Sequence, residues 1–157
     1  MSTSVVLPAV IGAADRALIG VETEPGYHLI EAGAVRRFCE AVGLADRIYV
    51  DVAVARAAGL RERPVPPTFW CAIQEPGSEL QRPLLGGWGT RNLNGGTEFE
   101  YVRPAFVGQT VACTARIAAI QEREARAGHA VITVIEHVWR DESGQVVTRS
   151  RLTGIRM

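Results

Sequence analysis

The sequence contains no lysine, because all 17 of its basic residues are arginine. Without a lysine amine, Schiff-base catalysis and the lysine-dependent P-loop are both excluded. The formal net charge is zero at neutral pH, so the chain lacks the positive potential that a nucleic acid or an anionic membrane surface would attract. We therefore expect neither nucleic acid nor a membrane among its partners.

Cysteine is scarce as well, with Cys39, Cys71 and Cys113 far apart in the chain. An odd number of separated cysteines without a CxxC motif predicts neither a disulfide framework nor a cysteine metal site, and it favours a reducing cytoplasm. No spacing of histidine and carboxylate residues indicates another metal site. The glycines do not form the G-x-G-x-x-G fingerprint of dinucleotide binding. We expect no metal and no cofactor.

Long hydrophobic runs are also missing, since no stretch approaches the roughly 20 apolar residues that span a bilayer. The first residues carry no basic region, and Pro8 and Gly12 interrupt their apolar run, which argues against a signal peptide. What the chain does have is 157 residues, 47% of them hydrophobic, without a repeat or a low-complexity tract. These values predict one soluble domain over residues 1–157 with one core.

Two helices are predicted in the first half of the chain. Apolar residues recur at three- and four-residue spacing over residues 34–42, which indicates an amphipathic helix ending at Gly43. A second helix is expected over residues 51–58, with Asp51 as its N-cap and Gly59 at its C-terminal end. A third helix should begin after the prolines of the VPPTF motif at residues 65–69.

The second half of the chain is rich in β-branched and alternating residues. A first strand is expected around Tyr27 and Leu29, before the helices. Four further strands are predicted from runs separated by turn residues: TEFEYV (97–102), TVACTARIAAIQ (110–121), HAVITVIEHVW (129–139) and QVVTRSRLTGIRM (145–157). Together they predict an α+β domain with a five-stranded antiparallel, curved sheet and helices on one face.

Three segments carry a resemblance to a known family: EAVGLADRIYVDVAVARAAGL (40–60), VPPTF (65–69) and NGGTEFEYVRPAFVGQTV (94–111). With them, the chain from about residue 19 onward resembles the MaoC-like hydratases and dehydratases of the hotdog fold. It is most similar to the branch of FAS1-like dehydratases, or MaoC N-terminal domains. The resemblance implies a hotdog fold, in which the curved sheet wraps around a central helix.

The catalytic positions implied by the resemblance are altered. Active members read G-D-x-N-P-x-H after the first helix, and the Asp and His act as base and acid, because hydration of a double bond needs two facing titratable groups. Aligned on Gly43, this chain has Leu44 for the Asp and Tyr49 for the His, with Asp46 at the Asn position. Asp46 and Tyr49 are the candidate catalytic residues. The alternatives are a turn-capping carboxylate for Asp46 and an aromatic packing role for Tyr49.

The resemblance also implies a substrate-binding set. In the family the thioester carbonyl lies at the N-terminus of the central helix, where amide groups stabilise an enolate-like oxygen; here that place is Pro67, Thr68 and Phe69. The LNGG motif contributes Asn94 and Gly95, and Asn94 stands where many members of the branch have histidine. Asparagine can orient a carbonyl or a water molecule, but it cannot exchange a proton near neutral pH.

The function implied is the binding of an acyl thioester, carried by coenzyme A or by an acyl carrier, within the enoyl hydratase and 3-hydroxyacyl dehydratase family. If the chain is active, the reaction is a hydro-lyase reaction, the reversible hydration of a 2-enoyl thioester. One alternative is a non-catalytic subunit of a heteromeric dehydratase. Another is a hotdog thioesterase, which needs a carboxylate near the carbonyl, with Glu98 and Glu100 as weakly placed candidates. We expect a homodimer, or a heterodimer with another hotdog subunit, because a curved sheet leaves an exposed edge.

Overall fold

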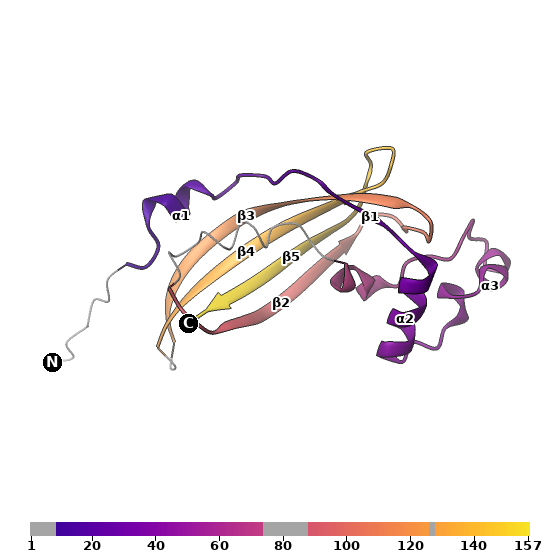
Figure 1. Ribbon diagram of the computed structural model, residues 1–157, viewed down its shortest axis with the longest axis horizontal. Coiled ribbons are helices and arrows are strands. Elements are labelled where there is room, and N and C mark those ends of the chain that lie inside the picture. The colour runs from indigo at the N-terminus through magenta and orange to yellow at the C-terminus, as the bar shows by residue number, and fades with distance from the viewer. Residues whose placement is uncertain (1–8, 74–87, 126–127) are drawn as a thin grey trace.

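The computed structural model describes residues 9–73, 88–125 and 128–157. Its main feature is one five-stranded antiparallel sheet in the strand order β1-β3-β4-β5-β2. The sheet is long and curved, and the helices that follow β1 gather at one end of it (Figure 1). The strands are β1 (Gly26–Leu29), β2 (Asn92–Tyr101), β3 (Thr110–Ala125), β4 (Gly128–Arg140) and β5 (Val146–Arg156). The predicted α+β hotdog architecture is confirmed.

Five short helical elements complete the described fold. They are α1 (Ala13–Ala17), α2 (Ala32–Val42), the 3-10 turn η1 (Arg47–Tyr49), α3 (Val52–Ala57) and the 3-10 helix η2 (Pro67–Ala72). Gly43 ends α2 with a φ of 69°, a left-handed conformation that glycine adopts without steric cost. Among the described residues, every helix is too short or too polar to span a bilayer.

Two elements differ from the sequence-based expectation. The third predicted helix is the six-residue 3-10 helix η2, and any continuation would fall on residues 74–87, outside the described residues. The helix α1 was not predicted, because five residues are too few to show helical periodicity. Its first turn forms where the Gly12 N–H donates to Asp15 Oδ2 at 2.8 Å.

The core lies on one face of the sheet, which we call the inner face and which carries Ile135, His137 and Trp139 of β4, all buried. At the helical end, Val35 and Cys39 of α2 pack with other buried residues against this face. At the opposite end, a second cluster joins an N-terminal residue to β3 and β4. Its buried members are Ile11, Ala115, Ile117, Ile120, Val131 and Ile135. The sheet thus has a helix-covered end and an end covered by the N-terminal segment.

The side chain of Asp51 caps α3 and supplies a pH-dependent prediction. Its Oδ1 accepts from Ala53 N at 2.9 Å and from Val54 N at 3.4 Å, and its Oδ2 pairs with Arg47. The two amide hydrogen bonds, with the Arg47 guanidinium, hold the pKa of Asp51 below its ordinary value. A lowered folded-state pKa means that the cap stabilises α3 above the ordinary aspartate pKa and is lost as pH falls through the lowered one.

We therefore expect the NMR amide shift of Ala53 to titrate with a midpoint below about 3.9, the ordinary aspartate pKa. The variant Asp51→Asn should abolish that titration, since the amide side chain does not ionise. A midpoint at or above the ordinary aspartate value would contradict the cap.

Candidate functional site

Residues 43–49, where the family resemblance implies a catalytic pair, are here called the overhang. It follows α2 directly, and the Leu44 amide N–H bonds the Cys39 carbonyl at 2.8 Å. The Leu44 side chain, half-buried, packs against the core cluster under the helices. The position expected for a catalytic carboxylate therefore holds an apolar packing residue.

Asp46 and Tyr49 lie at the two ends of η1. Asp46 is exposed, and its Oδ1 accepts a hydrogen bond from Ile48 N at 3.0 Å, so the side chain caps this turn. Tyr49 is half-buried and packs against the core cluster that includes Phe69 and Trp70. Capping and packing are thus observed for these two side chains, while their catalytic roles stay predictions.

At the start of η2, one backbone N–H has no hydrogen-bond acceptor among the described residues. Pro66 and Pro67 have no N–H, and the Phe69 amide already donates to the Pro66 carbonyl at 3.0 Å. The exposed Thr68 has the remaining N–H of this turn, and it makes no hydrogen bond to another described residue. Of the predicted carbonyl-binding set, Thr68 is therefore the amide available to a ligand, whereas Phe69 packs edge-to-face on Phe38 with ring centroids 5.5 Å apart.

Tyr101 fixes η2 to the end of β2. Its hydroxyl donates to the Pro67 carbonyl at 2.7 Å. Burial raises the pKa of Tyr101, so the phenol stays protonated and keeps donating near neutral pH. The anchor joins η2 to the edge strand of the sheet, and the predicted carbonyl-binding residues lie at this junction.

A pocket of about 400 Å³ opens beside this junction, a volume within the range of small-molecule sites. Its walls are formed by the residues that lead into η2, η2 itself, the end of β2, the segment that follows β2, and β5. The lining residues include Val65, Pro67, Trp70, Tyr101, Arg103 and Thr148. Neither Tyr101 nor Thr148 is predicted as a site residue from the sequence. No motif marks them, because strand pairing alone brings them together.

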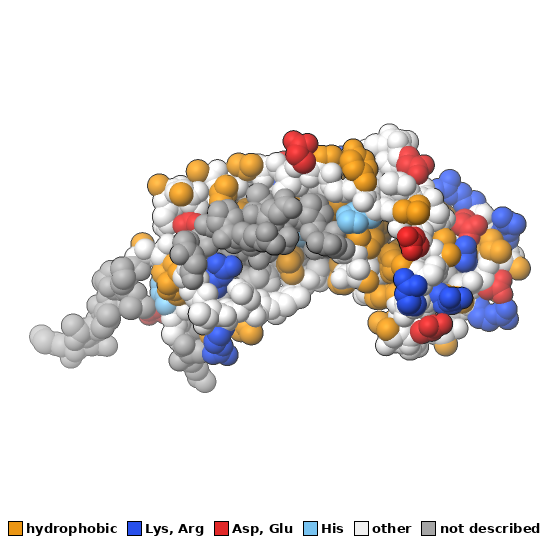
Figure 2. All heavy atoms as spheres, viewed as in Figure 1, with side chains coloured by type: hydrophobic (Ala, Val, Ile, Leu, Met, Phe, Trp, Pro, Cys, Tyr) orange, Lys and Arg blue, Asp and Glu red, His pale blue; other side chains and the backbone are white. Residues whose placement is uncertain are grey.

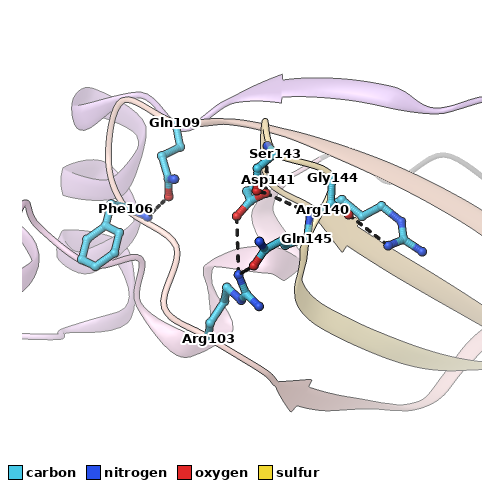
Figure 3. A network of polar contacts seen from close by, with 8 residues as sticks. All are labelled: Arg103, Phe106, Gln109, Arg140, Asp141, Ser143, Gly144 and Gln145. Atoms are coloured by element: carbon cyan, nitrogen blue, oxygen red, sulfur yellow. Dashed lines mark hydrogen bonds and ion pairs between the residues drawn. The ribbon is translucent and has the colours of Figure 1, made fainter.

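A network of polar contacts holds one wall of this pocket in position. The Arg103 guanidinium bonds the Gln145 side chain and lies 4.0 Å from Asp141 Oδ2. Asp141 in turn accepts from the amides of Ser143 and Gln145, both at 3.0 Å, inside the β4–β5 turn. Figure 3 shows these contacts tying the segment after β2 to that turn. At least one side of the Arg103 guanidinium is therefore occupied by contacts within the fold.

The charged side chains on the face seen in Figure 2 gather mainly over α2 and α3. Two ion pairs belong to this part of the chain: Arg36 and Glu40 pair on the exposed side of α2, and Arg47 of η1 pairs with the half-buried Asp51, the N-cap of α3. Exposed pairs of this kind are solvated and contribute little to stability. The overhang therefore lies among solvated charges of both signs.

Asn94 and Gly95 lie on β2 at a β-bulge. Asn94 pairs with Gly154, Gly96 pairs with Thr153, and Gly95 is the extra residue. A Cβ added to Gly95 would meet Thr153 Cγ2 at 3.0 Å, which explains the need for glycine at this close approach. Asn94 Oδ1 accepts from Gly96 N at 2.8 Å.

The bulge decides which face Asn94 occupies. Its register turns Asn94 to the inner face, the same face as Phe99, which pairs with Ser150. Without the extra residue, the odd spacing of Asn94 and Phe99 would put them on opposite faces. At about 3.3 Å per residue, however, Asn94 is roughly 20 Å along β2 from Tyr101. Within one chain, Asn94 therefore lies too far from the Pro67–Phe69 junction to share a site with it.

None of the three histidines lies in the overhang. His28 of β1 stacks at a tilt against Trp139, with ring centroids 5.7 Å apart, and burial lowers its pKa. His137 Nδ1 lies 3.2 Å from Ser150 Oγ in the sheet, and His129 Nε2 lies 3.1 Å from Glu122. Across the described ranges, no group of three or more histidine, cysteine and carboxylate residues is arranged to hold a metal ion.

Comparison with known proteins gives the same fold. The chain is 34% identical over 139 residues to a UPF0336 protein of Streptomyces griseus, covering 86% of this chain and 89% of the relative. The ChsH1–ChsH2 complex from Mycobacterium tuberculosis has a similar chain, with a TM-score of 0.77, 19% identity and coverage of 92% of both chains. The HadBC (3R-hydroxyacyl-ACP dehydratase) complex from Mycobacterium tuberculosis matches with a TM-score of 0.72 and 18% identity, over 88% of this chain and 96% of that one.

These structural similarities are at low identity and concern the fold. A profile of the FAS1-like, dehydratase domain region matches residues 17–150, which is most of the chain and spans the overhang, η2, β2 and the site pocket. The protein therefore belongs to the FAS1-like, dehydratase domain region family.

Proposed function

We propose that this protein binds an acyl thioester, delivered by coenzyme A or an acyl carrier, as a half-site of a hydratase or dehydratase whose acid–base pair comes from another hotdog subunit. The observation that carries the proposal is the overhang. Its carboxylate position is the packing residue Leu44, and its nearest carboxylate, Asp46, is exposed and caps η1. A binding pocket is thus combined with an overhang that lacks the facing acid and base.

The edge strand β2 supports the pairing with another subunit. It bonds β5 on one side, and among the described residues no strand pairs with its other side. Leu93 and Val102, at its two ends, are exposed apolar residues, and an exposed apolar edge is a template for strand addition. In an antiparallel pairing centred between Thr97 and Glu98, Leu93 of one hotdog subunit lies opposite the position of Val102 in the other.

The same register would bring together predicted site residues that lie far apart within one chain. It brings Asn94 opposite the Tyr101 position of the other subunit, and Tyr101 contacts Pro67. The proposed site is therefore composite, with Asn94 and Gly95 contributed across the pair to the Pro67–Phe69 junction. The names of the ChsH1–ChsH2 and HadBC complexes describe two-component assemblies of similar fold, which supports a partner of this class.

The thioesterase alternative has less support. Glu98 pairs with Arg151 and Glu100 with Arg149 in the β2–β5 ladder, and these pairs alternate with the inner-face pair of Phe99 and Ser150. Both carboxylates therefore point to the outer face, away from η2.

The proposal also includes a single domain over residues 1–157 and a cytoplasmic location for the protein.

The test is to titrate the purified chain with a panel of saturated and 2-enoyl-CoA thioesters, measuring binding by calorimetry and hydration by loss of the enoyl absorbance. We expect saturable binding without turnover, because no acid–base pair among the described residues faces the pocket. Turnover that is lost in Asp46→Asn or Tyr49→Phe would instead establish a self-contained site built on these two residues. No binding of any thioester would overturn the proposal itself.

A further inference from the structure

The floor of the pocket beside η2 contains a polar group that the fold leaves unused. Thr148 of β5 is 1% exposed and lines the pocket. Its hydroxyl has no hydrogen-bond partner among the described residues. Buried hydroxyls are almost always paired, so one without a partner that borders a cavity calls for a functional explanation.

A second unpaired donor lies next to it. Thr148 pairs across the strands with Trp139, which is fully buried, and the Trp139 indole N–H also has no partner in the described part of the chain. The indole packs against Trp70, a pocket residue, with ring centroids 5.1 Å apart. Two neighbouring residues thus leave hydrogen-bonding capacity unused at the same end of the inner face, whereas the lining around Thr148 is largely apolar.

The chemistry of this position selects a neutral oxygen. A threonine hydroxyl both donates and accepts, and the nearest cation of the pocket wall, Arg103, is bonded to Gln145 and paired with Asp141. A carboxylate or phosphate beside Thr148 would therefore have to compete with Asp141 for the Arg103 guanidinium. A hydroxyl or carbonyl oxygen on an otherwise apolar chain fits both the hydroxyl and the apolar walls.

We propose that the Thr148 hydroxyl hydrogen-bonds the 3-hydroxyl group of a bound 3-hydroxyacyl thioester, so that the pocket prefers the hydrated acyl chain over the saturated one. This inference rests on the proposed acyl-thioester function. The thioester carbonyl is common to every candidate ligand, and only the 3-hydroxyl separates the hydrated chain from the others. The preference therefore identifies which oxygen Thr148 contacts.

The test compares binding of hexanoyl-CoA with that of the two 3-hydroxyhexanoyl-CoA enantiomers by calorimetry. In the wild type, one enantiomer should bind roughly three- to tenfold more tightly than hexanoyl-CoA, the gain of one net hydrogen bond. The isosteric variant Thr148→Val should reduce this ratio to about one, because it keeps the shape of the side chain and removes its hydroxyl. Thr148→Ser, which keeps the hydroxyl, should retain the preference.

The matched control is Thr114→Val on β3. Thr114 also has a buried hydroxyl without a partner among the described residues. It pairs with Val138 on the outer face, however, and does not line this pocket. The ratio of 3-hydroxyhexanoyl-CoA to hexanoyl-CoA affinity should therefore not change in this variant. Equal loss of affinity for all thioesters in Thr148→Val would assign Thr148 to the carbonyl and overturn the inference, as would an unchanged ratio. Failure of hexanoyl-CoA and of every other thioester of the panel to bind the wild type would instead refute the proposed acyl-binding function.

Discussion

Replacing Trp139 with alanine is expected to lower the free energy of unfolding by about 3–5 kcal/mol, the cost of removing a buried aromatic side chain. Trp139 is fully buried on the inner face, at the helix-covered end of the sheet. Its ring contacts His28 of β1 and Trp70 of η2, at centroid distances of 5.7 and 5.1 Å. One side chain thus links a strand at the edge of the sheet to the helix that borders the pocket.

In a protein of this size, that loss corresponds to a fall of roughly 10 °C in the midpoint of thermal unfolding, measurable by circular dichroism. Trp139→Phe should cost less than half as much, because it keeps a six-membered aromatic ring in the core and removes a smaller volume, together with the indole N–H that has no partner in the described part of the chain. A midpoint within about 2 °C of the wild type for Trp139→Ala would contradict the packing described, given how large buried-aromatic truncations usually are.

The second large effect is expected at the edge of the sheet. In the absence of a different hotdog subunit, the β2 edge should pair with a second copy of the chain. Leu93→Asp should then weaken self-association by roughly 100-fold or more, because burying an unpaired carboxylate in an interface costs several kcal/mol and a twofold pair contains it twice. Leu93 is 45% exposed in the single chain, so the folded subunit tolerates the charge.

Light scattering coupled to size-exclusion chromatography over a range of concentrations measures this effect. The matched control is Val42→Asp, at an apolar α2 residue that is 57% exposed and distant from β2 in the sequence; its association should equal that of the wild type. A wild-type chain that stays monomeric throughout, or a Leu93→Asp variant that still dimerises, would refute pairing through β2.

How far the sequence predicts this protein differs between elements. Residues 34–42 and 51–58 show helical spacing with glycine and aspartate at the ends, and both helices form where expected, with Gly43 and Asp51 in the predicted capping positions. Local hydrogen bonds and backbone preferences determine these features, so a short stretch of sequence contains the information. The five strands are likewise predicted from alternation, although the LNGG motif was taken to precede β2 and instead lies within it.

The altered overhang was also readable from the sequence, because Leu44, Asp46 and Tyr49 follow from aligning the segment on Gly43. The sequence alone does not distinguish capping, packing and catalysis as the roles of these side chains. Only the fold shows the Asp46 carboxylate on the Ile48 amide and the Leu44 side chain in the core.

The sequence by itself therefore predicted the five strands, the helices over residues 34–42 and 51–58 and the family, and it has Leu44 and Tyr49 where the family resemblance implies an acid–base pair. The tertiary structure alone decided which face each strand residue occupies and which distant residues meet. The bulge at Gly95 turns Asn94 to the inner face, and Tyr101 reaches the Pro67 carbonyl. Thr148 lines the pocket, and its hydroxyl has no partner among the described residues. The physical reason is that strand register is set by long-range pairing, and a shift of one residue reverses every side chain.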